Sequence, residues 1–202
     1  MHSNPSQVVA EPSVRNKINL TFNYIGKPDP RSKYAVKCMH GEIECRGNIQ
    51  QLCVQHVLDP RQSKSGSHHA EFGMEQEDDG GIIPTNPEGI TLNPIFPGMS
   101  FVSAQNYYDP RKIGQEEYAI SSLKSIGYSW TESGVADCVE GEQGKELLLA
   151  SVVRSRDELK QSKSCTILIG GKKRCVHDRG WYDCDVSRWV KSDKATCRPK
   201  EL

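Results

Sequence analysis

Eight cysteines constrain the fold of this 202-residue chain more than any other feature of its sequence. An even number at this density is typical of proteins that fold in an oxidising compartment, where cysteines pair as disulfides. We expect Cys175 and Cys184 to form a local pair, because the eight residues between them form a loop that contains Gly180. All the cysteines are disulfide candidates: Cys38, Cys45, Cys53, Cys138, Cys165, Cys175, Cys184 and Cys197.

The N-terminal residues do not fit the expectation of a chain that enters an oxidising compartment. Residues 1–17, MHSNPSQVVAEPSVRNK, lack the run of roughly 7 to 15 apolar residues that a signal peptide needs. Two explanations stay open: residues that precede Met1 in a longer precursor are missing, or the chain is intracellular and its cysteines are reduced or bind metal. In either case the sequence predicts a disordered leader at 1–16.

The charge balance excludes two classes of partner. Lys and Arg together number 26, as do Asp and Glu, so no net basic charge attracts nucleic acid or an anionic membrane. No stretch approaches the roughly 20 apolar residues that cross a bilayer. We therefore expect neither nucleic acid nor a membrane as a partner.

The spacing of apolar residues predicts a mixture of helices and strands. Ile18, Leu20 and Phe22 alternate with polar residues, as in a strand, whereas later apolar residues mostly recur at helical spacing. Thr131 is the expected cap of a short helix, and Gly127 is the expected end of the helix before it. The expected elements are a strand at 17–25, helices at 46–58, 115–127, 131–138 and 142–159, and a buried strand at 166–169 with a tight turn at Gly170–Gly171.

Two regions show no such periodicity. Residues 61–112 combine Ser, Gly and His, an acidic run and proline-punctuated apolar pairs, which indicates a long insertion of low order. Residues 173–202 carry cysteines among polar residues, which indicates a tail held by disulfides rather than by a core. We therefore expect one domain at 17–172, interrupted by the insertion.

Residues 38–56 concentrate side chains that can carry redox or metal chemistry. Zinc prefers thiolate and imidazole ligands, but the spacing fits none of the common paired zinc motifs. A redox-active dithiol usually needs C-x-x-C at a helix N-terminus, and the chain contains no such motif. We favour structural disulfides and expect no bound metal. The candidate zinc ligands are Cys38, His40, Cys45, Cys53 and His56.

The same block resembles the signature C-Q-H-G-x2-E-C-x2-N-x4-C of the gamma-interferon-inducible lysosomal thiol reductase (GILT) family, with Met39 in place of Gln. Asn19-Leu20-Thr21 resembles the N-x-T sequon of the family's strand. The residues after Cys138 resemble the family's C-x2-G-x2-G-x2-L helix entry. The signature residues are Cys38, His40, Gly41, Glu44, Cys45, Asn48 and Cys53, and those of the helix entry are Gly141, Gly144, Leu147 and Leu148.

The resemblance covers residues 17–58 and 116–172, and the tail resembles a lineage-specific, fungal-type version. It implies an α/β, thioredoxin-like fold with a helical insertion. It also implies a soluble enzyme without a cofactor that reduces disulfides of protein substrates, either secreted or in lysosomes or vacuoles. Within the signature, His40 has two candidate roles: an imidazolium that tunes a nearby thiolate, or a hydrogen bond that fixes the turn at Gly41.

Two departures from the family pattern bear on activity. The family's C-x-x-C lies upstream of the sequon strand, so the resemblance implies an N-terminally truncated chain without the first strand, the start of the active-site helix and the catalytic cysteines. Cys165 stands where the family has a cis-proline. We expect a trans bond there, because a cis bond before a non-proline residue costs about 2.5 to 4 kcal/mol.

Two functions therefore compete. One is a GILT-like thiol-disulfide oxidoreductase family member that is inactive in this form. The other is a non-catalytic, secreted binding protein stapled by disulfides. Asn19 is a glycosylation candidate wherever the chain enters an oxidising lumen.

Overall fold

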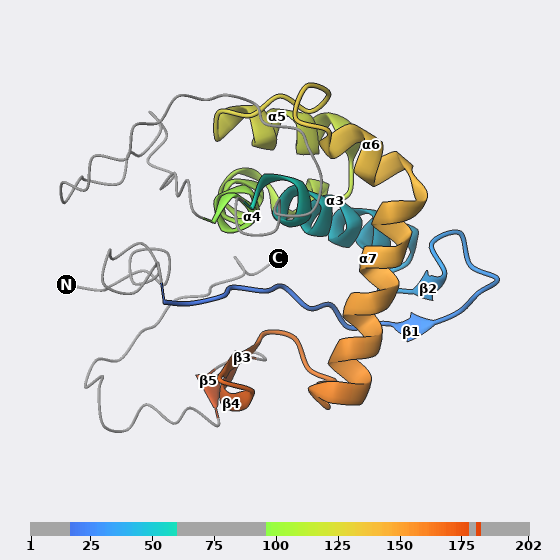
Figure 1. Ribbon diagram of the computed structural model, residues 1–202, viewed down its shortest axis with the longest axis vertical. Coiled ribbons are helices and arrows are strands. Elements are labelled where there is room, and N and C mark those ends of the chain that lie inside the picture. Colours follow the sequence, from blue (N-terminus) through green and yellow to red (C-terminus); the bar gives the residue numbers. More distant parts are fainter. Residues whose placement is uncertain (1–16, 60–95, 178–180, 183–202) are drawn as a thin grey trace.

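The structure, a computed structural model, describes residues 17–59, 96–177 and 181–182, and these form a mixed α/β fold. Helices gather at one end of the molecule, and the long helix α7 (Glu142–Val153) runs from them toward a small sheet at the other end (Figure 1). In the described part of the chain, no helix is long and apolar enough to cross a membrane. The predicted leader at 1–16 lies outside the described residues.

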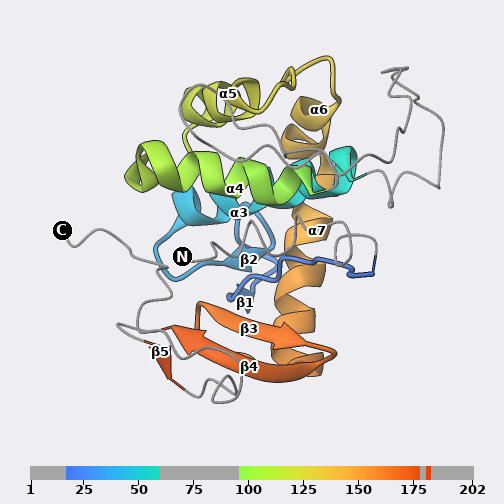
Figure 2. The same ribbon diagram turned by 90° about the vertical axis from the view of Figure 1, so that its left-hand side faces the viewer.

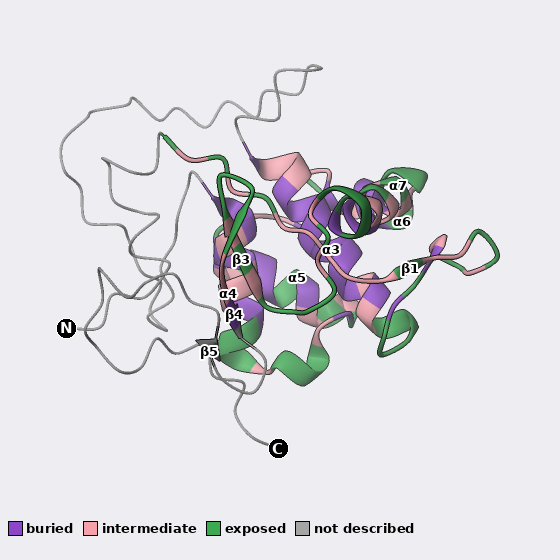
Figure 3. Cartoon of the chain, turned by 90° about the horizontal axis from the view of Figure 1, so that it is seen from below, coloured by how far each residue is buried: buried purple, intermediate pink, exposed green. Residues whose placement is uncertain are grey.

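Helix α3 (Glu42–Leu58) is the centre of the packing. It contacts helices α4 (Pro97–Tyr108), α6 (Val135–Glu140) and α7, and Figure 3 shows it as largely buried. Ile49, Cys53 and Val54 are almost fully shielded from solvent. Residues from three other helices therefore enclose this helix on most of its sides.

The predicted helix at 46–58 is confirmed, but α3 begins earlier, at Glu42. Gly41 precedes it with φ 88°, a left-handed conformation that glycine adopts without the cost that a side chain incurs. Glu42 and Glu44 occupy the first turn, where negative charge favours the helix dipole. The apolar periodicity begins only after this acidic turn, which is why it did not reveal the true start.

The low-order insertion predicted at 61–112 is wrong for its last part. Helix α4 and a short 3-10 turn at Pro110–Lys112 lie there, whereas 60–95 fall outside the described residues. Pro97 begins α4, a position where its missing N–H costs nothing. The helix buries Ser100 and Gln105 together with Phe101, so its inner face does not appear as an apolar stripe.

The following helices agree with the periodicity, apart from one cap. Helix α5 (Glu116–Ser125) ends just before Gly127, whose φ is 90°. Helix α6 begins after Gly134, at φ 79°, so Thr131 is not its cap as predicted. Helix α7 continues into a π-helical turn at Arg154–Glu158, and together they cover most of the predicted helix at 142–159.

Two small antiparallel sheets complete the fold. Strand β1 (Lys27–Pro28) pairs with β2 (Val36–Lys37), and a second sheet has the order β3 (Thr166–Ile169), β4 (Lys172–His177), β5 (Trp181–Tyr182). The second sheet lies across the far end of α7 from the main helical group (Figure 2).

The β3 to β5 sheet corrects two expectations. Strand β3 exists as predicted but is not buried, since Ile167 is 39% and Ile169 is 62% exposed. Among the described residues it is an edge strand, and its apolar run does not lie inside a sheet covered on both faces. The predicted tail also contains regular structure, because β4 and β5 lie within or at the start of 173–202.

The strand predicted at 17–25 is also wrong, because the described structure assigns no strand before Lys27. The alternation is real: Asn19 and Thr21 are exposed, while Leu20 and Phe22 are partly buried. A strand, however, needs a neighbouring strand to pair with. Here the side chain of Gln55 binds the backbone at Leu20 and Phe22 instead.

Candidate functional site

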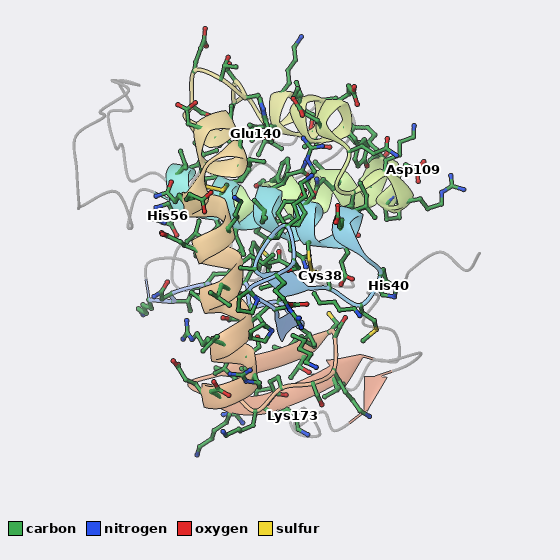
Figure 4. The ribbon with its side chains drawn as sticks, turned by 90° about the vertical axis from the view of Figure 1, so that its right-hand side faces the viewer. Cys38, His40, His56, Asp109, Glu140 and Lys173 are labelled. Carbon is green, nitrogen blue, oxygen red and sulfur yellow. A yellow bond between two sulfur atoms is a disulfide. The ribbon has the colours of Figure 1, made fainter. Side chains whose placement is uncertain are left out.

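The signature residues surround the N-terminal end of α3. Cys38 and Cys45 form a disulfide with 5.5 Å between their Cα atoms, and it closes a short loop around the start of the helix (Figure 4). The two residues are only 4% and 2% exposed. The disulfide therefore joins β2 and its following turn to α3 from inside the protein.

Glu44 organises the turn within this loop. Its carboxylate accepts a hydrogen bond of 2.6 Å from the backbone N–H of His40 and lies 3.2 Å from Nδ1 of the same residue. The His40 side chain is 76% exposed. The backbone N–H of His40 thus makes the hydrogen bond at the turn before Gly41, while its imidazole lies within ion-pair distance of Glu44.

Asn48 faces the disulfide from the next turn of α3. Its Nδ2 lies 4.0 Å from the sulfur of Cys38, and the residue is buried. A buried amide donor needs a partner, and the polarizable sulfur supplies one. The signature's Asn thus packs against the signature's first cysteine.

The last signature cysteine joins two helices. Cys53 on α3 forms a disulfide with Cys138 on α6, across a sequence separation of 85 residues. Both residues are almost fully buried. This second disulfide fixes the helical group around α3.

The surroundings of Gly144 explain why the helix entry, the residues that follow Cys138, has a glycine at this position. A Cβ atom at this position would stand 2.6 Å from the carbonyl oxygen of Cys138 and 2.7 Å from Cγ2 of Ile49. The sulfur of Cys53 would be 3.4 Å away. Only a residue without a side chain lets α7 approach the second disulfide this closely.

A chain of buried and partly buried polar groups crosses the same helical region. The hydroxyl of Tyr24 donates to Oε1 of Gln51 at 2.5 Å, and Nε2 of Gln51 donates to Oε1 of Gln105 at 2.7 Å. The hydroxyl of Tyr118 donates to the carbonyl of Gln105. Burial raises the pKa of the Tyr24 hydroxyl, so it stays a hydrogen-bond donor.

Arg46 joins the first turns of α3 to two other helices. Its guanidinium lies 2.5 Å from Glu116 on α5 and 3.2 Å from Glu140 on α6. Burial alone would lower the pKa of Arg46, but hydrogen bonds to the two carboxylates outweigh it and raise the pKa overall. This ion-pair network is the main charged contact beside the signature loop.

The arrangement does not support the zinc alternative. Cys38, Cys45 and Cys53 are in disulfides, which removes them as thiolate ligands. His40 precedes α3 and His56 lies in its last turn, so the helix separates them by roughly 20 Å (Figure 4). Among the described residues, no group of three or more His, Cys, Asp or Glu could hold a metal ion.

The remaining cysteines lie near the β3 to β5 sheet or outside the described part. Cys165 is exposed and is in neither of the two disulfides above. The Ser164–Cys165 peptide bond is cis, so the expected trans bond is wrong. Cys175 is disulfide-bonded, but its predicted partner Cys184 lies outside the described residues, as does Cys197.

The sequence patterns missed three buried glutamines of α3, which lie outside both the apolar periodicity and the signature. Gln55 binds the backbone at Leu20 and Phe22, and Gln50 donates to the carbonyl of Gly114 at 3.4 Å. The only sequence signal is their density within one helix. The three are Gln50, Gln51 and Gln55.

Part of this chain is similar to a known protein family. The family model for gamma interferon inducible lysosomal thiol reductase (GILT) matches residues 2–70, about a third of the chain. No curated protein and no solved structure matches the chain. The matched segment contains the whole signature block at 38–53, whose disulfides, turn and buried amide have just been described. Over residues 2–70, this chain is therefore similar to the gamma interferon inducible lysosomal thiol reductase family.

Proposed function

We propose that this chain has the thioredoxin-like architecture of a thiol-disulfide oxidoreductase that recognises disulfide-bearing proteins, and that these 202 residues do not themselves turn over a disulfide. The proposal joins the family similarity of residues 2–70 to the state of the signature cysteines. Reduction of a substrate needs a thiolate that attacks and a second cysteine that resolves the mixed disulfide. The sequence contains no C-x-x-C to supply such a pair.

The observation that carries the proposal is the burial of the signature disulfides. Cys38, Cys45, Cys53 and Cys138 are each at most 4% exposed. A substrate disulfide must reach the attacking sulfur directly, and a buried sulfur offers no such approach. The geometry therefore favours a structural role for these four cysteines.

The chemistry of the site also supports an oxidising location. Disulfides form and persist in secreted proteins and in related compartments, and they are rare in the cytosol. We therefore propose that the protein is secreted or resides in a lysosome or vacuole, where disulfide-containing proteins would be its partners.

We predict that the oxidised full chain will not reduce insulin or a fluorescent dipeptide disulfide catalytically when a dithiol reductant is supplied. The matched control is the Cys38→Ala/Cys45→Ala variant, which lacks the more accessible signature pair. The expected rates of the two proteins are equal to the rate of the reductant alone. Turnover by the unchanged chain that this variant loses would contradict the proposal and make the signature disulfide redox-active.

A second candidate is a non-catalytic, disulfide-stapled binding protein. The loop closed by Cys38 and Cys45 favours it, because Met39 and Ile43 expose apolar side chains beside His40. Exposed apolar side chains on a loop held by a disulfide are typical of contact surfaces. This function also predicts no turnover in the activity assay described above.

Asn19 is predicted to carry a glycan when the chain is expressed with an added signal sequence. Asn19 and Thr21 of the sequon are both exposed, so the acceptor side chain is not shielded by the described structure. Endoglycosidase treatment should increase the mobility of the secreted chain but not that of Asn19→Gln. A secreted chain whose mobility does not change would contradict the prediction.

A further inference from the structure

We propose that a cavity between α3, α7 and residues 21–23 binds a small organic acid, namely a carboxylate that carries an apolar group about the size of a benzene ring. The cavity has a volume of about 200 Å³. None of the described residues that line it is a cysteine, so this site goes beyond the proposed function and involves no redox step.

Two packed helices and one further segment enclose the cavity. On α3, the lining residues Leu52 and His56 lie one turn apart and share a face of the helix. On α7, Leu147 and Ser151 do the same. The two helices contact each other, and Figure 4 shows His56 beside α7. Residues 21–23 close the third side of the cavity.

The size and the apolar part of the cavity define the body of the ligand. An apolar protein cavity of roughly 150 Å³ takes up benzene, so the larger volume here holds a ring together with a short acidic arm. Phe22, Leu52, Leu147 and Ala150 contribute apolar side chains to the wall. Moving an apolar ring from water onto such a wall is favourable.

Ser151 supplies a buried hydrogen-bond donor at the wall. The residue is 5% exposed, and its Oγ accepts a hydrogen bond of 2.8 Å from the backbone N–H of Tyr24. A hydroxyl also carries one hydrogen that it can donate. Within the described part of the chain, no group accepts a hydrogen bond from this hydroxyl. Buried donors are normally paired, so an oxygen atom of a ligand in the cavity is the partner that the hydroxyl lacks.

Arg154 supplies a positive charge one turn further along. It lines the same cavity and lies three positions after Ser151. Its guanidinium donates no hydrogen bond within the described part of the chain, although Oε2 of Glu158 lies 3.5 Å from its Nε. Both side chains of that ion pair are exposed, and such surface pairs contribute little to stability. A guanidinium beside a hydroxyl donor matches the two oxygens of a carboxylate.

The rest of the wall favours a negative ligand. Among the described lining residues, His56 and Arg154 are the basic side chains, and none is Asp or Glu. Every hydrogen bond and ion pair of these lining residues has its partner within the described part of the chain. The amide of Gln55 already binds the neighbouring backbone through both of its ends. Gln55 therefore forms wall, and Ser151 and Arg154 are the groups that would hold the carboxylate.

The test is an NMR titration of the oxidised, unglycosylated full chain with phenylacetate. A ligand of this size binds weakly, so concentrations up to about 20 mM are used at constant ionic strength. Amide signals of residues 21–23, 52–56 and 147–154 should shift and saturate together. Signals of α5, none of whose residues lines the cavity, should not move. Phenylacetamide keeps the ring but removes the charge, and it should bind about fivefold more weakly.

Two variants with the same change in net charge separate the cavity from general electrostatic attraction. Arg154→Gln should weaken phenylacetate binding by about fivefold. Arg156→Gln should leave binding unchanged, because Arg156 pairs with Asp157 and does not line the cavity.

A second pair of variants changes the volume of the cavity at an exposed helix residue. Ala150→Leu should abolish binding, because the longer side chain fills the space that the ring needs. Ala150→Ser should retain binding. Chemical denaturation of both variants should show that they are folded.

Three results would overturn the proposal. One is the absence of saturable shifts at the lining residues. Another is an equal loss of binding in Arg154→Gln and Arg156→Gln. The third is phenylacetamide that binds as tightly as phenylacetate, which would show an apolar cavity without a preference for an anion. Because neither probe contains sulfur, none of these results bears on disulfide turnover.

Discussion

Replacing Cys53 and Cys138 together by alanine is expected to lower the free energy of unfolding by about 4.5 kcal/mol, the larger of the losses expected for the two disulfides described above. The bond closes a loop across a sequence separation of 85 residues, so its removal frees much more chain entropy in the unfolded state than a local bond does. Both cysteines are almost fully buried, so their removal also loosens packing between α3 and α6. Chemical denaturation under oxidising conditions measures the loss.

The Cys38→Ala/Cys45→Ala variant is the matched control for that measurement. This disulfide spans a sequence separation of only 7, and the expected loss is about 2.5 kcal/mol. The order of the two losses follows from loop length and does not depend on the absolute values. Equal losses, or a larger loss for the local pair, would contradict the assignment of Cys53 to Cys138.

Gly144→Ala is expected to destabilise the protein by about 2 to 3 kcal/mol, although alanine is the better helix former. In an open helix the change would stabilise by roughly 0.5 to 1 kcal/mol. Here the new Cβ would stand 2.6 Å from a backbone carbonyl oxygen of Cys138, and the backbone cannot rotate away as a flexible side chain can. Thermal or denaturant unfolding gives the sign and size of the effect.

Glu146→Ala provides the control on the same helix. Glu146 is exposed, and its replacement should change stability by less than about 0.5 kcal/mol. A Gly144→Ala protein as stable as the unchanged chain would show that α7 does not approach the second disulfide as closely as described. The family pattern at Gly144 would then need another explanation.

Features set by local chemistry were predictable from the sequence. Helices α5 and α7 follow from apolar spacing, and glycine marks the end of α5. Strand β3 and its Gly170–Gly171 turn were predicted for the same reason. Each of these depends on residues within one or two turns of the chain.

Features set by distant contacts were not predictable. Helix α4 was missed because Gln105 is buried through a hydrogen bond with Gln51, so polarity hides its inner face. The segment at 17–25 has the alternation of a strand, but pairing depends on what lies beside it, and Gln55 lies there. The period of the apolar residues indicates the face of an element on which a side chain lies, but it does not indicate which residue that side chain contacts.

The candidate site also has some features that the sequence predicted and others that it did not. The signature identified the residues and a family resemblance, whereas the pairings did not follow from spacing, since eight cysteines allow 105 connectivities. The zinc alternative drew on Cys38, His40, Cys45, Cys53 and His56. Only the structure shows that the three cysteines are in disulfides and that α3 separates the two histidines. The role of Gly144 likewise depends on the position of Cys138.

Disulfide mapping tests the central claim, that the signature cysteines are paired and structural. Alkylation of the native chain, followed by tryptic digestion without reduction, should give peptide 38–46 lighter by two hydrogens than its reduced form, because Cys38 and Cys45 are its only cysteines. Peptide 47–61 should be linked to peptide 125–145 through Cys53 and Cys138. Alkylated Cys38 or Cys45, or a link between peptides 38–46 and 47–61, would contradict the account.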